Sequence, residues 1–325
     1  CTKGSCNMPS LLELKQTIKA VYVRYETYIL HILRFLIALV ALLVINSTLH
    51  FETQMTSPVV VLVSSLLCAI LPAGFTIFIC AAFVLIHLFQ LSVETFAACA
   101  ILFLFIWLSY ARFLTKDILA LVLTPLAFYF HLPQIVPLVL AIFFAPSSLI
   151  TLICGTVIYF FLHYISVNAA QYLPNSSAEE IVTRLQGMAG ALFADKTMLF
   201  YLIAFSATFA VTYLLRRRSM DHAWTIAIVS GSFTDLFLLM LGDLFFDTSI
   251  SIPGTVIGVL LAGGIGYVVR LFAFHLDYQW AEQVQFEDDD YYYYVKAIPK
   301  VAMTRKQEVI KQITRQKTKK PDATD

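Results

Sequence analysis

Charged residues are scarce in this chain. Only 13% of its 325 residues are charged and 59% are hydrophobic, whereas a soluble domain carries about 25% charged residues. The formal net charge is +1, so the sequence lacks the basic excess that binds nucleic acid. The composition therefore argues against two soluble domains, which the length alone would allow, and indicates a membrane protein.

The motifs of soluble enzymes are missing as well. The chain has no phosphate-binding glycine loop followed by lysine, no nucleophile elbow and no paired-cysteine metal ribbon. Its six cysteines have neither zinc-finger spacing nor the pattern of a disulfide framework. We therefore expect a protein that is not an enzyme and that uses no cofactor.

Apolar runs of membrane-spanning length recur along most of the chain. A helix needs roughly 20 apolar residues to cross a bilayer core of about 30 Å. The sequence predicts an all-α polytopic membrane domain over residues 29–275, an amphipathic segment over 1–28 and a small cytoplasmic tail over 276–325. About ten spans are predicted, at Ile29–Leu49, Pro58–Ala73, Phe75–Gln90, Val93–Phe113, Ile118–Phe130, Pro133–Ala145, Ser148–Ile165, Lys196–Leu215, Ala223–Phe246 and Pro253–His275.

Basic residues set the expected orientation. Lysine and arginine gather on the cytoplasmic side of membrane proteins. With ten spans, all the basic clusters fall on one side: before the first span, between the fourth and fifth, after the eighth and in the tail. Both termini are therefore predicted to be cytoplasmic. The short loops favour a bacterial plasma membrane.

The fifth and sixth spans are short, and each contains a proline, Pro125 or Pro137. Two interpretations are open. The segments are half-spanning helices that meet inside the membrane near His131, as in transporters that bind solute at broken helices, or they are ordinary tilted helices that tolerate proline. After the seventh span, the pattern from Ser176 to Leu192 predicts a short amphipathic helix on the outer surface.

Two carboxylates lie in the ninth span. Asp235 is near its middle and Asp243 is near its far end. A carboxylate at bilayer depth is costly, so it must face protein or water. Gly231, Leu238 and Gly242 share the helical face of Asp235. Both aspartates are candidates for proton or cation coupling, and the alternative is a structural acid bonded to hydroxyl groups on a neighbouring helix.

The tenth span carries one small residue per turn, at Gly254, Gly258, Ala262 and Gly266. A smooth face of this kind allows another helix backbone to approach closely. We expect the ninth and tenth spans to form a central pair around which the other helices pack.

Histidines and carboxylates also gather at the predicted outer ends of the helices. Imidazole and carboxylate groups can bind a transition metal. A metal site formed by His87, His131, His163 and Glu94 is one interpretation, and ordinary interfacial anchors are the other.

The tail combines an acidic run at 287–290, a strand-prone tyrosine run at 291–294 and a basic end. We expect the basic end to bind anionic lipid or a cytoplasmic protein; its candidate residues are Lys311, Arg315, Lys317, Lys319 and Lys320.

Two functions follow from these features. The first is a transporter or exporter of a small solute, for which Asp235 is the candidate residue for coupling to protons. The alternative is a membrane subunit or scaffold that does not transport and that docks a partner through its tail.

Overall fold

The computed structural model describes residues 11–113, 118–172, 178–218, 220, 222–246, 248, 251–273, 282–287 and 292–297. The chain divides into two units, Cys1–Phe272 and Ala273–Asp325. The first unit is helical in the part that is described. Its elements are α1 (Leu11–Leu49), α2 (Pro58–Ile70), α3 (Ala73–Leu91), α4 (Val93–Phe113), α5 (Ile118–Tyr129), α6 (Ile135–Phe143), α7 (Ser148–Val167), η1 (Ala169–Tyr172), α8 (Ala178–Ala194), α9 (Lys196–Arg216), α10 (Ala223–Phe246) and α11 (Ile252–Ala273).

Each of the ten predicted spans corresponds to one helix, but not every helix is long enough to cross a bilayer. Within the described residues, six helices are both long and apolar enough to cross, namely those containing Arg24–Leu49, Gly74–Leu91, Ser148–Val167, Lys196–Arg216, Ala223–Phe246 and Ile252–Arg270. Ten complete spans are therefore more than the structure supports. The break in α1 falls at Tyr25, close to the predicted boundary between the amphipathic segment and the first span.

The shortest apolar helices are α5 and α6, with 12 and 9 residues. At 1.5 Å per residue they extend about 18 Å and 14 Å, so neither crosses a core of about 30 Å alone. Of the two interpretations of this region, half-spanning helices therefore fit better than complete tilted spans. The reversal between them includes His131, whose φ of 59° lies in the left-handed region.

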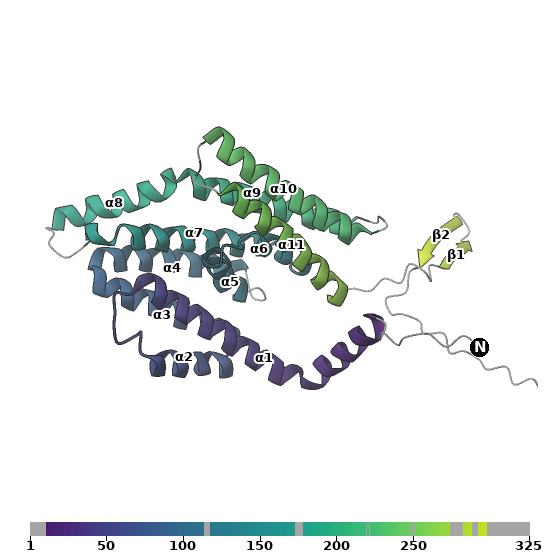
Figure 1. Cartoon of the computed structure of the whole chain (residues 1–325), viewed down its shortest axis with the longest axis horizontal. Coiled ribbons are helices and arrows are strands. Elements are labelled where there is room, and N and C mark those ends of the chain that lie inside the picture. Colours follow the sequence, from purple (N-terminus) through teal and green to yellow (C-terminus); the bar gives the residue numbers. More distant parts are fainter. Residues whose placement is uncertain are drawn as a thin grey trace, which may run out of the picture. The chain divides into compact units, whose positions relative to one another are not determined.

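The core of the helical unit is built around these two short helices (Figure 1). α5 packs on α1, α3 and α7, and α6 packs on α7, α9 and α10. Phe128 of α5 is the centre of an aromatic cluster and contacts the rings of Tyr159, Phe160, Tyr201 and Phe205. This cluster joins α5 to α7 and α9, because those helices carry its four other rings.

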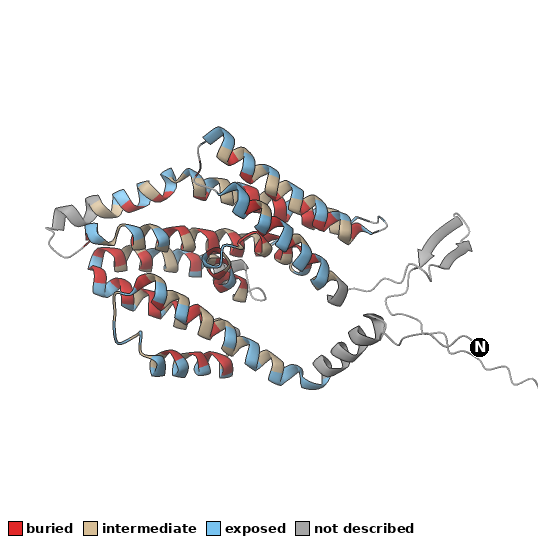
Figure 2. Ribbon diagram, in the orientation of Figure 1, coloured by how far each residue is buried: buried red, intermediate tan, exposed pale blue. Residues whose placement is uncertain are grey.

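The helices have many exposed residues (pale blue in Figure 2), and a large number of these are hydrophobic. Large exposed hydrophobic side chains include Leu62 and Leu66 on α2 and Phe233 and Phe237 on α10. Extended apolar surface of this kind is unfavourable in water and marks a site of interaction. It is compatible with contact with a lipid bilayer.

The helix predicted after the seventh span is confirmed as α8. Met188 and Leu192, two residues of its predicted apolar stripe, are buried. Arg184 of α8 also forms an ion pair with Glu94 of α4, at 3.3 Å. α8 is therefore fastened to the helical unit by both apolar and ionic contacts, while its place at an outer membrane surface stays a prediction.

The predicted central pair is wrong, because the most extensive helix packing joins α9 to α10 and not α10 to α11. Three of the four small residues on α11 are buried, namely Gly258, Ala262 and Gly266, whereas Gly254 is exposed. Gly258 and Gly266 approach side chains of Gln134, Ile142 and Ile228 and no neighbouring helix backbone. The smooth face therefore makes room for side chains.

The second unit contains two strands, β1 (Glu282–Glu287) and β2 (Tyr292–Ala297). They pair antiparallel, with Glu282 opposite Ala297 and Glu287 opposite Tyr292. The tyrosine run predicted to be strand-prone therefore lies largely in β2. The five basic residues predicted to bind lipid or a partner lie outside the described residues.

Candidate functional site

A polar cavity of about 590 Å³ opens among the ends of several helices. The turn between α5 and α6 contributes His131 and Gln134, and α7 contributes Tyr159 and His163. The rest of the lining comes mainly from the first residues of α9 and α11 and from Tyr201. The cavity therefore forms where the short helices reverse direction, among the first turns of two helices long enough to span a bilayer.

Asp195 fixes the beginning of α9 at this cavity. Its Oδ1 accepts hydrogen bonds from the backbone N–H groups of Thr197 and Met198, at 2.9 and 3.3 Å. A carboxylate in this position caps the helix and favours its positive end. Asp195 is thus a structural cap that also lines the cavity.

Gln134 is a buried amide in the same lining, only 3% exposed. Its Oε1 has no hydrogen-bond partner among the described residues. The amide fits because α11 has glycine opposite it: a Cβ atom at Gly258 would lie 2.5 Å from this Oε1. A buried carbonyl oxygen without a partner is costly, so this group is available to a bound solute or water.

Asp235 lies deeper, between α9 and α10, and is fully buried. One carboxylate oxygen, Oδ1, accepts a hydrogen bond of 3.4 Å from the hydroxyl of Thr208. The other oxygen, Oδ2, has no partner among the described residues. Since an isolated buried carboxylate is strongly disfavoured, this arrangement favours the neutral, protonated acid.

An unpaired hydroxyl group lies near Asp235 at the same helix interface. The hydroxyl oxygen of Thr212 on α9 is buried and has no hydrogen-bond partner in the described part of the chain. Ser232 of α10 also has such an oxygen, but its side chain lies beside Gly263 of α11. Gly231, one turn before Asp235, leaves space that the Thr212 side chain occupies. The α9–α10 interface is therefore polar at its centre.

Tyr201 connects the cavity with this buried acid. Its ring lines the cavity and also packs against the small cluster formed by Ala204 and Leu239. Leu239 lies one helical turn from Asp235 on α10. Tyr201 therefore contacts both the polar cavity and a cluster that adjoins Asp235.

The two aspartates predicted as coupling candidates have different surroundings. Asp243 is half-buried and lies two turns beyond Asp235 on α10, about 12 Å along the axis. The predicted face is largely confirmed, since Gly231, Asp235 and Gly242 are all buried, although Leu239 replaces Leu238 as the buried leucine.

The four predicted metal ligands are not brought together. Glu94 pairs with Arg184, while His87 is buried and bonded to Asn46 and to the backbone of Glu52. His131 and His163 do share a cavity. Nevertheless, no group of three metal-ligating side chains occurs among the described residues.

Near His87, a hydrogen bond from the backbone N–H of Gln54 lowers the pKa of the exposed Glu52 carboxyl. This bond fixes the loop that follows α1. It favours the charged carboxylate at neutral pH.

Arg216 determines the other end of α6. Its guanidinium donates to the backbone carbonyls of Ile142 and Phe144, at the last turn of that helix. It also stacks over the rings of Tyr213 and Trp224. Arg216 is the last residue of α9. Its hydrogen bonds therefore hold the end of the short helix α6 at the end of a helix long enough to span a bilayer.

Several of these residues were not predicted from the sequence, notably Gln134, Tyr201 and Arg216 in these roles. Gln134 offered a signal, because it is a polar residue beside proline between two apolar runs. Tyr201 offered none, since its role depends on a cavity formed by helices far apart in the chain.

Comparisons with protein-family models, with curated proteins and with solved structures find no match. The functional assignment therefore rests on the geometry of Asp235 and the cavity.

Proposed function

We propose that the chain is an integral membrane protein that moves a small solute across the bilayer, and that Asp235 couples this movement to protons. The observation that carries the proposal is the incomplete bonding of Asp235. It is fully buried, yet it has one long hydrogen bond, and its other oxygen has no partner among the described residues. A carboxylate retained for stability would be surrounded by donors. A carboxylate that gains and loses a proton in a cycle needs only partial bonding.

The short helices support the same function. Transporters often hold solute where broken helices meet inside the membrane. Here the polar cavity lies at the reversal between α5 and α6, and Tyr201 of its lining packs on the cluster that contains Leu239, one turn from Asp235. The cavity supplies a place for a solute, and the buried acid supplies a place for a proton.

The orientation belongs to this proposal. We place both termini in the cytoplasm of a bacterial cell, with the chain in the plasma membrane. The basic clusters share one side if α2 and α4 either both cross or both do not, and if α5 and α6 either both cross or together return to the side from which α5 begins. Arg216 bonds the end of α6, which supports a common level for the ends of α6 and α9.

The test measures proton movement in proteoliposomes that enclose a pH-sensitive dye. Amino acids, sugars, organic acids and inorganic cations are added one at a time to the parent, to Asp235→Asn and to Asp243→Asn. One solute class should drive proton movement in the parent. Asp235→Asn should reduce it at least about tenfold, because an amide cannot exchange a proton, and Asp243→Asn should retain most of it.

Two outcomes would contradict the proposal. Proton movement in Asp235→Asn at the parental rate would remove the coupling role of this residue. The absence of solute-driven proton movement in the parent, across all solute classes, would count against coupled transport itself.

A second candidate function is a membrane subunit that does not transport and that docks a partner through its tail. The observation that favours it is the hairpin of β1 and β2, which belongs to a separate unit. A two-stranded hairpin is only marginally stable alone, and its free edges can pair with another strand. Deleting residues 276–325 should remove co-purifying proteins under this hypothesis and leave solute flux unchanged under the first.

A further inference from the structure

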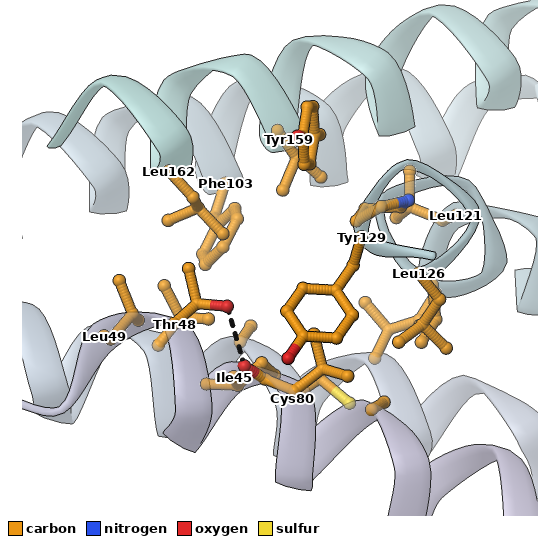
Figure 3. A pocket seen from close by; sticks show the side chains of 18 of the residues that line it. Ile45, Thr48, Leu49, Cys80, Phe103, Leu121, Leu126, Tyr129, Tyr159 and Leu162 are labelled. Carbon is orange, nitrogen blue, oxygen red and sulfur yellow. Dashed lines mark hydrogen bonds between the residues drawn. The ribbon is translucent and has the colours of Figure 1, made fainter. Parts of the chain in front are cut away.

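A second and larger cavity, of about 840 Å³, lies among α1, α3, α4, α5 and α7 (Figure 3). It is distinct from the polar cavity described above but shares His131, Tyr159 and His163 with it. Its volume falls within the range of about 300–1,000 Å³ that is typical of pockets for one small ligand.

Most polar groups of this cavity are gathered at one end. They come from the last turns of α1 and α7 and from the end of α5, and they comprise Ser47, Thr48, Tyr129, His131, His163 and Ser166. Tyr159 and Trp107, which also line the cavity, add a hydroxyl and an indole N–H. The hydroxyls of Ser47 and Tyr129 lie 3.1 Å apart and are hydrogen-bonded to each other. The Ser166 hydroxyl donates to the carbonyl of Thr48, at 3.1 Å. This end therefore joins three helix ends through oxygen and nitrogen groups.

The remainder of the wall is largely apolar. Figure 3 shows Ile45, Leu121 and Leu126 among the residues that line the cavity. From Tyr129 back to Leu121 is eight residues along α5, or about 12 Å. That depth is close to one leaflet of the hydrocarbon core, about 15 Å. A uniformly polar solute would lose its hydration against this wall without compensation.

We propose that this cavity binds a single-chain amphiphile, with its alkyl chain along α5 and an oxygen-bearing head at the end formed by Ser47, Tyr129 and His163. The imidazole of His163 can donate a hydrogen bond to an oxygen of a carboxylate or phosphate head. The Ser47 hydroxyl donates to the carbonyl of Val44, at 2.9 Å, so it accepts the hydrogen of the Tyr129 hydroxyl. Tyr129 donates to a head oxygen by rotating this hydrogen away from Ser47. The lining contains no carboxylate among the described residues, so nothing there favours a cationic head. The volume suits one chain of this kind.

This inference goes beyond the proposed function, because it assigns a ligand to the second cavity, and binding there can be measured without transport. A failure of binding is therefore distinguishable from a failure of proton coupling at Asp235.

The test uses Trp107, which lines the cavity. The other two tryptophans, Trp224 and Trp280, are replaced by Phe in the full-length chain so that fluorescence reports Trp107 alone. The probe is a long-chain fatty acid with a bromine at the end of the chain, added at low mole fraction to the purified protein in lipid nanodiscs. A bromoalkane of the same length, which has no head, is the second probe.

Quenching by the brominated fatty acid should saturate in the parent. Ala81→Phe fills the cavity and should weaken binding at least about tenfold, while Ala82→Phe, on the exposed side of the same helix, should leave binding unchanged. Tyr129→Phe removes one hydroxyl from the polar end and should weaken binding of the fatty acid but not of the bromoalkane. This conservative variant keeps the test valid if Ala81→Phe does not fold.

Two results would overturn the proposal. Equal quenching without saturation in the parent, Ala81→Phe and Ala82→Phe would mean that Trp107 meets only bulk lipid. Equally tight binding of the bromoalkane and the fatty acid would mean that the polar end does not recognise a head.

Discussion

Asp235 and His87 show how two buried polar residues differ at the scale of single atoms. The Nε2 of His87 lies 2.8 Å from Oδ1 of Asn46, and its Nδ1 accepts the backbone N–H of Glu52 at 3.1 Å. Because that N–H can only donate, Nδ1 carries the lone pair and Nε2 carries the hydrogen. Both ring nitrogens are satisfied, so His87 fastens the loop after α1 and is structural. By contrast, Oδ1 of Asp235 accepts one long hydrogen bond, and its Oδ2 has no hydrogen-bond partner among the described residues.

The sequence could place Asp235 in a helix at membrane depth. It could not show that Asp235 and His87 differ in role, one as a candidate functional residue and the other as a structural one. Both are single polar residues in apolar runs. What distinguishes them is the number of partners supplied by other segments, such as Thr208 on α9 and Asn46 on α1. Those partners are far away in the chain, and a single sequence does not show that they meet.

This difference predicts opposite effects of the same substitution. Asp235→Leu removes a poorly bonded buried acid, so the melting temperature of the purified protein should stay the same or rise. His87→Leu leaves an amide oxygen and a backbone N–H unpaired, at a cost of about 1–3 kcal/mol each, so the melting temperature should fall clearly. If the melting temperature of Asp235→Leu falls as far as that of His87→Leu, Asp235 is structural and the proton-coupling role loses its basis.

At the scale of elements, helix positions were predictable and helix partners were not. The boundaries of α7, α9 and α10 follow the ends of apolar runs, where serine, lysine and arginine appear. The pairing of α9 with α10 depends instead on the fit of Gly231 and Gly242 against side chains of α9. Small residues on α11 suggested a backbone contact, whereas Gly258 receives the Gln134 amide. A small residue on a helix indicates a close contact, but it does not show whether a backbone or a side chain makes that contact.

Three glycines give a graded prediction. A Cβ atom at Gly155 of α7 would lie 2.6 Å from Cβ of Thr124, which cannot rotate away. Gly155→Ala should therefore force α5 and α7 apart and cost about 1–3 kcal/mol. Gly258→Ala should cost less, because its clash is with the end of the flexible Gln134 side chain.

Gly190→Ala on α8 is the control, since nothing lies within 4 Å of its added Cβ atom, and it should be neutral or stabilising by up to about 1 kcal/mol. Thermal unfolding in one detergent ranks the three variants. If Gly155→Ala has the same melting temperature as the parent, α5 and α7 are not in close contact.

At the scale of the whole molecule, composition was sufficient to predict a helical chain with bilayer-compatible surfaces, but not how many helices cross. The periodicity of α5 and α6 does not distinguish a half-spanning helix from a complete one; their lengths of 12 and 9 residues do. The cavities were equally beyond prediction, because each is lined by several helices that are separated in sequence. Local patterns therefore give the elements, and long-range packing gives the site.

Orientation is the property of the whole molecule that basic residues predict most directly. Single cysteines at Ser219, Asn175 and Lys306 would be placed in a background with Cys1→Ser and Cys6→Ser, since Cys68, Cys80 and Cys99 are buried. The background itself, which retains the half-buried Cys154, measures residual labelling. If the basic clusters face the cytoplasm, an impermeant thiol reagent applied to intact cells should label the Asn175 position only, and the other two should react after lysis. Labelling of the Lys306 position before lysis would reverse the orientation, and equal labelling at Ser219 and Asn175 would show that α9 does not cross the membrane.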